Sequence, residues 1–176
     1  MKKILCILLL SALALTLAAC SSGGGPTLNE DGLVPYSESE LEFALPEEMT
    51  LSTVNYADIC YSDGTAGFLV YFYPRDTLLT DLFLDKDATV EEYAEWFVYR
   101  NGYVGVEKKL DESGKRIELS YVYDPDGENT RYVDIIMRNT DILIHVTLSC
   151  PNEKSAEYEG AFDTWKKYVS LTYPDR

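Results

Sequence analysis

His145 is the side chain best suited to acid–base chemistry, and it is the only histidine in this 176-residue chain. It lies in the run 142–148, whose continuous apolar character predicts a strand covered on both faces. One histidine cannot build a zinc site of several histidines, and no serine lies in a G-x-S-x-G motif. We therefore expect His145 to be a neutral, hydrogen-bonded residue of a sheet, because burial disfavours the charged imidazole. The alternative is a general base that acts on an unrecognised nucleophile.

The segment from Asp124 to Asn129 crowds side-chain oxygens as a calcium-binding loop does. Its spacing fails the EF-hand pattern, which needs a third ligand before the glycine and a distal glutamate. Pro-Asp-Gly within the segment is also a common turn sequence. We expect a turn here, and no metal or cofactor is predicted anywhere in the chain.

Tyrosines in strand-like runs are the remaining candidates for a binding site. A tyrosine offers a flat apolar ring and a polar hydroxyl, so several on one face can line a groove for a peptide, a glycan or an apolar ligand. The alternative is ordinary cross-strand packing beneath helices. The candidates are Tyr71, Tyr73, Tyr121, Tyr123 and Tyr132.

The N-terminal segment predicts export and lipidation. Lys2 and Lys3 precede an apolar run over 4–17, and this run is shorter than the roughly 20 residues that a membrane-spanning helix needs. The sequence Leu-Ala-Ala-Cys at 17–20 resembles the lipobox of bacterial lipoproteins. In that family the cysteine thiol receives a diacylglyceryl group, and a peptidase cleaves just before the cysteine.

This resemblance implies a signal peptide over 1–19 and a lipidated Cys20 at the mature N-terminus. Two or three acyl chains hold a protein durably at a bilayer without spanning it. We expect anchoring at the extracytoplasmic face of the cell membrane, or at the outer membrane in a host with two membranes.

The charge balance argues against nucleic acids and anionic membrane surfaces as partners. The chain holds 15 Lys and Arg against 30 Asp and Glu, a formal net charge of −15. Nucleic acids and anionic membrane surfaces both require clustered cations. We expect no nucleic-acid partner, and contact with the membrane through the lipid alone.

Cys60 and Cys150 remain once Cys6 leaves with the signal peptide and Cys20 carries lipid. An oxidising compartment permits a disulfide between them, and its loop of about 90 residues would contribute ~4–5 kcal/mol in the chain-entropy model. Two buried thiols are the alternative, because sequence spacing does not give the distance between them.

The elements that must position these residues follow from composition and periodicity. Small and polar residues over 20–39 predict a flexible tether, and 40–176 a single globular domain. Within the domain, residue alternation predicts a strand over 41–45 and strand-rich runs over 53–61 and 66–73. Alternation and short polar turns also predict a meander of strands over 104–110, 115–123, 130–138 and 141–149.

Two helices complete the prediction. Thr89 and Glu92 match a capping box ahead of an apolar stripe that ends at Asn101-Gly102. Apolar residues at helical spacing from Tyr158 to Val169 predict a C-terminal helix. The stretch 74–88 is expected to be an ordered connection with about one helical turn.

The opening Phe-Ala-Leu-Pro-Glu-Glu-Met at 43–49, followed by these elements in this order, resembles PsbP-like domains. This superfamily includes the extrinsic PsbP subunit of photosystem II and DcrB-like bacterial lipoproteins. The resemblance covers roughly residues 40–173 and implies an α/β/α sandwich. It would be an antiparallel sheet of about six or seven strands with helices on both faces.

The family has no shared catalytic residues to transfer. We therefore expect a non-catalytic binding or scaffold module for an envelope partner or a small ligand. An envelope hydrolase with an active site around His145 is the alternative.

The lipobox generates the first testable prediction. Cys20→Ala should accumulate as an uncleaved precursor or be shed from the membrane, because lipid attachment needs the thiol. Fractionation and incorporation of labelled palmitate measure this, with Cys6→Ala as a control that should be processed normally. Processing of Cys20→Ala after Ala19 with full membrane retention would contradict the lipoprotein prediction.

Overall fold

The computed structural model describes residues 26–124, 127 and 129–174. The predicted signal peptide, Cys20 and part of the predicted turn from Asp124 to Asn129 lie outside these residues. Within the described part of the chain, no helix is both long and apolar enough to cross a membrane.

A seven-stranded antiparallel sheet forms the centre of the fold, with strand order β3-β4-β5-β9-β8-β7-β6. The short polar turns after residues 110, 123 and 138 return the chain directly beside itself, which confirms the predicted meander. Its strands are β3 (Thr50–Leu51), β4 (Ile59–Ser62), β5 (Gly67–Pro74), β6 (Glu107–Leu110), β7 (Arg116–Tyr123), β8 (Thr130–Arg138) and β9 (Ile142–Pro151).

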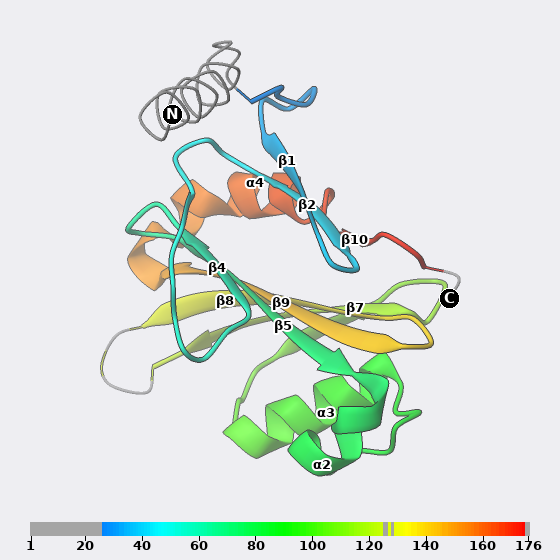
Figure 1. Cartoon of the computed structure of the whole chain (residues 1–176). Helices are drawn as coiled ribbons and strands as arrows, with labels where there is room; N and C mark the ends of the chain where they lie inside the picture. The colour runs from blue at the N-terminus through cyan, green and yellow to red at the C-terminus, as the bar shows by residue number, and fades with distance from the viewer. Residues whose placement is uncertain (1–25, 125–126, 128, 175–176) are drawn as a thin grey trace, which may run out of the picture.

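A second sheet of three short strands lies above one face of the first (Figure 1). It contains β1 (Val34–Glu38), β2 (Leu41–Leu45) and β10 (Ser170–Leu171). The predicted tether over 20–39 therefore ends too late, because β1 pairs with β2 along its whole length and Leu33 and Val34 are buried. The few apolar residues in this polar segment were too sparse to predict a strand.

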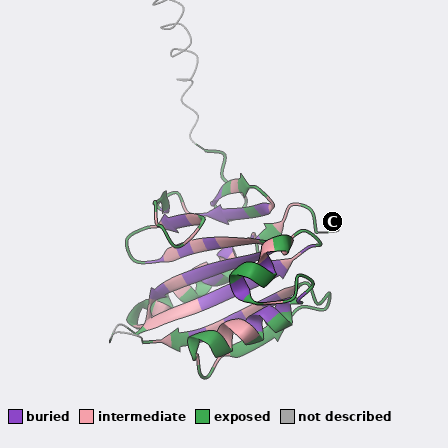
Figure 2. Ribbon diagram, turned by 60° about the horizontal axis from the view of Figure 1, so that its bottom comes forward, coloured by how far each residue is buried: buried purple, intermediate pink, exposed green. Residues whose placement is uncertain are grey.

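Helices cover both faces of the large sheet, so the predicted sandwich class is confirmed (Figure 1). The short helices η1 (Arg75–Thr77) and α2 (Leu78–Leu82) and the longer α3 (Val90–Asn101) pack on one face. After η2 (Asn152–Lys154), α4 (Ser155–Trp165) packs on the other face together with the small sheet. Figure 2 shows the buried residues gathered in the central strands and the exposed residues on the outer turns of the helices.

The predicted capping box fixes where α3 begins. The Glu92 amide donates to the Thr89 hydroxyl at 3.1 Å, and the Thr89 amide donates to the Glu92 carboxylate at 2.8 Å. Gly102 ends the helix at φ 68°, a left-handed conformation that glycine adopts without steric cost.

Three predicted elements are shorter in the structure. The strand predicted over 104–110 begins only at Glu107. The strand-rich run 53–61 is a loop until Ile59, which leaves Tyr56 64% exposed. The C-terminal helix ends at Trp165, and Tyr168 and Val169 lie beyond it. Arg116 ends this helix by donating to the Lys166 carbonyl at 2.9 Å and the Val169 carbonyl at 2.6 Å.

Cys60 and Cys150 are free, buried thiols, which is the second of the two alternatives that the sequence leaves open. Cys60 pairs with Leu69, and Leu69 pairs with Thr147 across β5. Cross-strand partners share a face, whereas Cys150 lies three residues beyond Thr147 and therefore points to the opposite face. No disulfide can join side chains that point away from each other across two strand spacings.

Candidate functional site

The five candidate tyrosines all lie on the face of the large sheet that α3 covers. Tyr121 and Tyr132 are directly paired across β7 and β8, and Tyr71 is paired with His145 across β5 and β9. Paired residues share a face, and residues two apart on a strand share it too. The register therefore places Tyr73 beside Tyr71, and Tyr123 beside Tyr121.

These five tyrosines line one cavity of about 460 Å³. The floor comes from β5, β9, β8 and β7, while the C-terminal half of α3 and the chain on either side of the sheet form the rim. Its lining residues are Tyr56, Leu69, Tyr71, Tyr73, Phe97, Asn101, Tyr103, Tyr121, Tyr123, Tyr132, His145, Thr147 and Ser149.

Aromatic contacts fix the walls of this cavity. Tyr103 stacks on Tyr121 with ring centres 4.5 Å apart, and Tyr121 stacks on Tyr132 at 5.3 Å. Tyr71 and Tyr73 lie almost parallel at 6.5 Å on the opposite wall. The tyrosines therefore combine the two roles considered for them. Their rings pack across strands, and their remaining surface lines a cavity.

The carboxylate of Asp134 lies directly behind this wall and is 0% exposed. One of its oxygens accepts the Tyr121 hydroxyl at 2.8 Å, and the other accepts the Thr147 hydroxyl at 2.7 Å. His145 Nε2 lies 3.1 Å from the latter oxygen. Burial of a carboxylate is tolerated only where donors replace its water, and here three side chains do so.

His145 is the hydrogen-bonded sheet residue that the sequence predicted, at 2% exposure. Its Nδ1 lies 2.9 Å from the hydroxyl of Tyr93 on α3. With Nε2–H directed at Asp134, Nδ1 accepts from Tyr93, and this tautomer satisfies every partner with a neutral imidazole. The ring also meets Phe97 edge to face at 4.7 Å, so both nitrogens and one edge are occupied.

Two further tyrosines of the cavity wall pack against this network. The ring of Tyr73 lies 5.7 Å from that of Tyr93, and Tyr103 stacks on Tyr121. Burial raises the pKa of Tyr73 and of Tyr103, and the neighbouring tyrosine offsets part of the rise in each.

The inner tyrosines are held as neutral phenols. Burial, followed by the charge of Asp134, raises the pKa of Tyr121 far above its usual value. Burial raises the pKa of Tyr93 as well, and neighbouring Tyr73 adds to the rise. Neither hydroxyl is disposed to ionise, so neither is an activated nucleophile.

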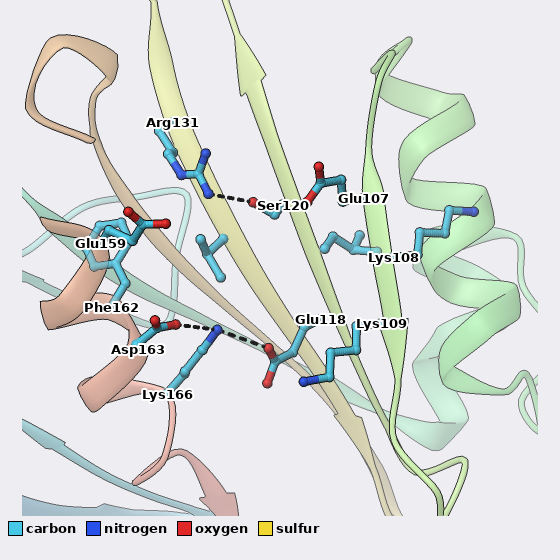
Figure 3. A pocket seen from close by; sticks show the side chains of 12 residues that line it. Glu107, Lys108, Lys109, Glu118, Ser120, Arg131, Glu159, Phe162, Asp163 and Lys166 are labelled. Atoms are coloured by element: carbon cyan, nitrogen blue, oxygen red, sulfur yellow. Dashed lines mark hydrogen bonds and ion pairs between the residues drawn. The ribbon is translucent and has the colours of Figure 1, made fainter. Parts of the chain in front are cut away.

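A second cavity, of about 300 Å³, lies on the other face between α4 and the strands β6, β7 and β8 (Figure 3). Lys166 bridges Asp163 at 2.8 Å and Glu118 at 3.3 Å, while Arg131 donates to Ser120 at 3.0 Å. These charged groups satisfy one another at the surface, where such pairs are worth about 0–1 kcal/mol. The tyrosine-lined cavity is the stronger candidate site, because its polar groups converge on a buried, prebuilt network.

Sequence reasoning missed the residues that organise the site. Asp134 interrupts the apolar run from Val133 to Ile136, and a lone carboxylate in a central strand is a signal of a buried polar site. Tyr93 lies by its spacing in the apolar stripe of its helix, so the sequence does not mark its hydroxyl as a partner of His145. The contributions of Tyr56 and Tyr103 depend on loop positions that no periodicity reveals.

Comparisons with known proteins support the fold. No protein-family model matches the chain, and no curated protein matches it by sequence. The solution structure of cyanobacterial PsbP (CyanoP) from Synechocystis sp. PCC 6803 matches with a TM-score of 0.58 at 18% identity, over 85% of this chain and 98% of that one. The fold is therefore PsbP-like.

Two further solved structures match more distantly. LpqN of Mycobacterium tuberculosis, described as involved in cell envelope biogenesis, gives a TM-score of 0.51 at 10% identity, over 84% of this chain and 90% of that one. The Ran-binding protein Mog1p of Saccharomyces cerevisiae gives 0.50 at 10% identity, over 86% and 96%. At these identities the likeness concerns the fold alone.

The buried network predicts a large effect of one substitution. Asp134→Ala should lower the free energy of unfolding by about 3–5 kcal/mol, because Tyr121, Thr147 and His145 lose their shared acceptor. Glu157→Ala, which removes the exposed partner of Lys154, should cost at most about 1 kcal/mol. Urea unfolding followed by tryptophan fluorescence measures both, and equal losses would contradict the network.

The raised pKa values predict alkaline sensitivity. A group whose pKa is higher in the folded state stabilises the fold below its unfolded pKa, near 10 for tyrosine, and loses that contribution as pH rises toward the folded value. The tyrosines concerned are Tyr71, Tyr73, Tyr93, Tyr103, Tyr121 and Tyr132.

Unfolding free energies measured between about pH 8 and about pH 11 should therefore fall above pH ~10, by up to about 1.4 kcal/mol per pH unit for each group. Phenolate absorbance should rise together with unfolding. The double variant Tyr71→Phe, Tyr132→Phe should show a shallower loss. A flat profile in the parent chain would show that these phenols titrate freely.

Proposed function

We propose that this chain is a lipid-anchored extracytoplasmic module that binds a small ligand, without catalysis, in its tyrosine-lined cavity. The observation that carries the proposal is the cavity of about 460 Å³ built over the Asp134–His145 network. Small-molecule sites typically measure about 300–1,000 Å³ and combine apolar walls with a few fixed polar groups.

Preorganisation of the walls supports binding. Tyr121 is held by its hydrogen bond to Asp134, and Tyr103 is held in turn by stacking on Tyr121. Rings fixed before a ligand arrives lose little conformational entropy when it binds. Such a surface is suited to recognition.

A hydrolase remains the second candidate, because Tyr93, His145 and Asp134 lie in the order hydroxyl, imidazole, carboxylate. Two facts favour binding over this reaction. Tyr93 is 0% exposed, so its hydroxyl cannot meet a substrate, and both His145 nitrogens already have protein partners. The nearby Thr147 hydroxyl is committed to Asp134.

A lipid anchor at Cys20 would leave the tyrosine-lined cavity facing away from the membrane. The described chain begins beside β1, in the layer opposite α2 and α3 (Figure 1). The six residue steps between Cys20 and Pro26 span at most about 20 Å. We propose that the α3 face points away from the membrane, toward the envelope space. The fold is shared with LpqN, described as involved in cell envelope biogenesis, which is compatible with this location.

A cavity-filling substitution tests the proposal. Ser149→Trp should place an indole in the tyrosine-lined cavity, whereas Ser120→Trp fills the charged cavity on the other face as a matched control. Native mass spectrometry of the full chain, purified in detergent after exposure to an extract of host metabolites, should show a bound mass. Ser149→Trp should lose that mass and Ser120→Trp should keep it.

Absence of any bound mass, or its retention in Ser149→Trp, would contradict the proposal. His145→Gln separates binding from catalysis, because it removes imidazole chemistry while keeping hydrogen-bonding capacity. We expect it to lower stability by about 1–3 kcal/mol while the ligand mass is retained. If His145→Gln keeps the stability of the parent chain but loses the phenotype that the parent chain confers on the cell envelope, the hydrolase is favoured.

A further inference from the structure

The walls of the cavity have the electrostatic character of an aromatic box. Among the described residues that line it there is no lysine, arginine, aspartate or glutamate. Tyr71 and Tyr73 on β5 lie across the floor from the stacked Tyr121 and Tyr132. The face of an aromatic ring carries negative potential, and a cation among several such faces is attracted to all of them.

Tyrosine hydroxyls add hydrogen-bond acceptors to this surface. Tyr71, Tyr73, Tyr123 and Tyr132 all line the cavity. A phenol oxygen accepts hydrogen bonds as well as donating one. The wall therefore offers acceptor oxygens to a ligand that carries N–H hydrogens.

A buried negative charge lies behind the same wall. Asp134 is 0% exposed, and its charge contributes to the raised pKa of Tyr71, Tyr103 and Tyr132 after burial, the larger cause. Its potential thus reaches residues on both walls. The net charge of −15 for the whole chain acts in the same sense. An anionic ligand would meet no cation in the lining and an adverse potential.

We propose that the ligand is a small organic cation of the ammonium class, held by the tyrosine faces with its N–H or N-methyl hydrogens toward the wall oxygens. This inference rests on the proposed binding function and names the chemistry of its ligand. A cavity of about 460 Å³ suits a compact molecule rather than a polymer.

Calorimetric titration of the full chain in detergent tests the inference. The probes are choline, tetramethylammonium and benzylammonium, with 3,3-dimethylbutan-1-ol as the uncharged analogue of choline. At least one ammonium compound should bind, and choline should bind at least about tenfold more tightly than its uncharged analogue.

Variants place the interaction in the cavity. Tyr71→Leu should weaken ammonium binding by about tenfold, because it removes a ring, whereas Tyr71→Phe should stay close to the parent. Tyr168→Leu, on the α4 side of the molecule, is the matched control and should have no effect. Asp134→Asn, checked for folding, should weaken ammonium binding without weakening binding of the uncharged alcohol. If this variant does not fold, the comparison of Tyr71→Leu with Tyr71→Phe tests the inference.

The outcomes separate the two proposals. If the uncharged alcohol binds as tightly as choline, or if no ammonium probe binds although Ser149→Trp abolishes an extract-derived ligand, the ammonium inference is wrong and the binding function stands. If no ammonium probe binds and no extract-derived ligand is found, both are wrong. Ammonium binding that survives in Tyr71→Leu and Ser149→Trp would place the cation elsewhere and overturn the inference.

Discussion

The α3 face of the sheet is organised around the requirement that the buried carboxylate of Asp134 be given hydrogen-bond donors. A charge in the interior costs several kcal/mol unless its environment replaces the lost water. Thr147 and His145 from β9 and Tyr121 from β7 meet this requirement from both neighbouring strands. His145 then carries the constraint to α3 through Tyr93, so one carboxylate joins three strands and a helix.

The opposite face follows a different physical rule. There the core is apolar and aromatic, with Phe43 of the small sheet stacked on Phe68 of β5 at 4.8 Å, and with Phe162 and Trp165 of α4 completing it. Such a core gains stability from burial in proportion to its area and needs no directional partners. The α3 face has an apolar core of its own, but it also holds polar groups in fixed positions beside a cavity.

The sequence predicted the parts of this arrangement that local rules determine. The capping box at Thr89, the meander from β6 to β9 and the tyrosine-bearing strands follow from periodicity and turn chemistry. The pairing of β1 with β2 and the opposite faces of Cys60 and Cys150 depend on strand order, which alternation within one strand does not encode. The organising role of Asp134 escaped prediction for the same reason, because its donors are distant in the chain. Tyr121 precedes it by 13 positions, and His145 and Thr147 follow it by 11 and 13.

The cavity exists because the network fixes α3 at one end of the sheet while Gly102 stops the helix before it covers the other end. Tyr93 is hydrogen-bonded to His145, and the helix ends at Asn101, eight residues later, which leaves Tyr132 and Ser149 only partly covered. A longer helix would have filled this space with its own side chains. Since Tyr121 lines the cavity and donates its hydroxyl to Asp134, a ligand that contacts Tyr121 acts on a hydrogen bond that stabilises the α3 face. Binding and folding stability are therefore expected to be coupled in this domain.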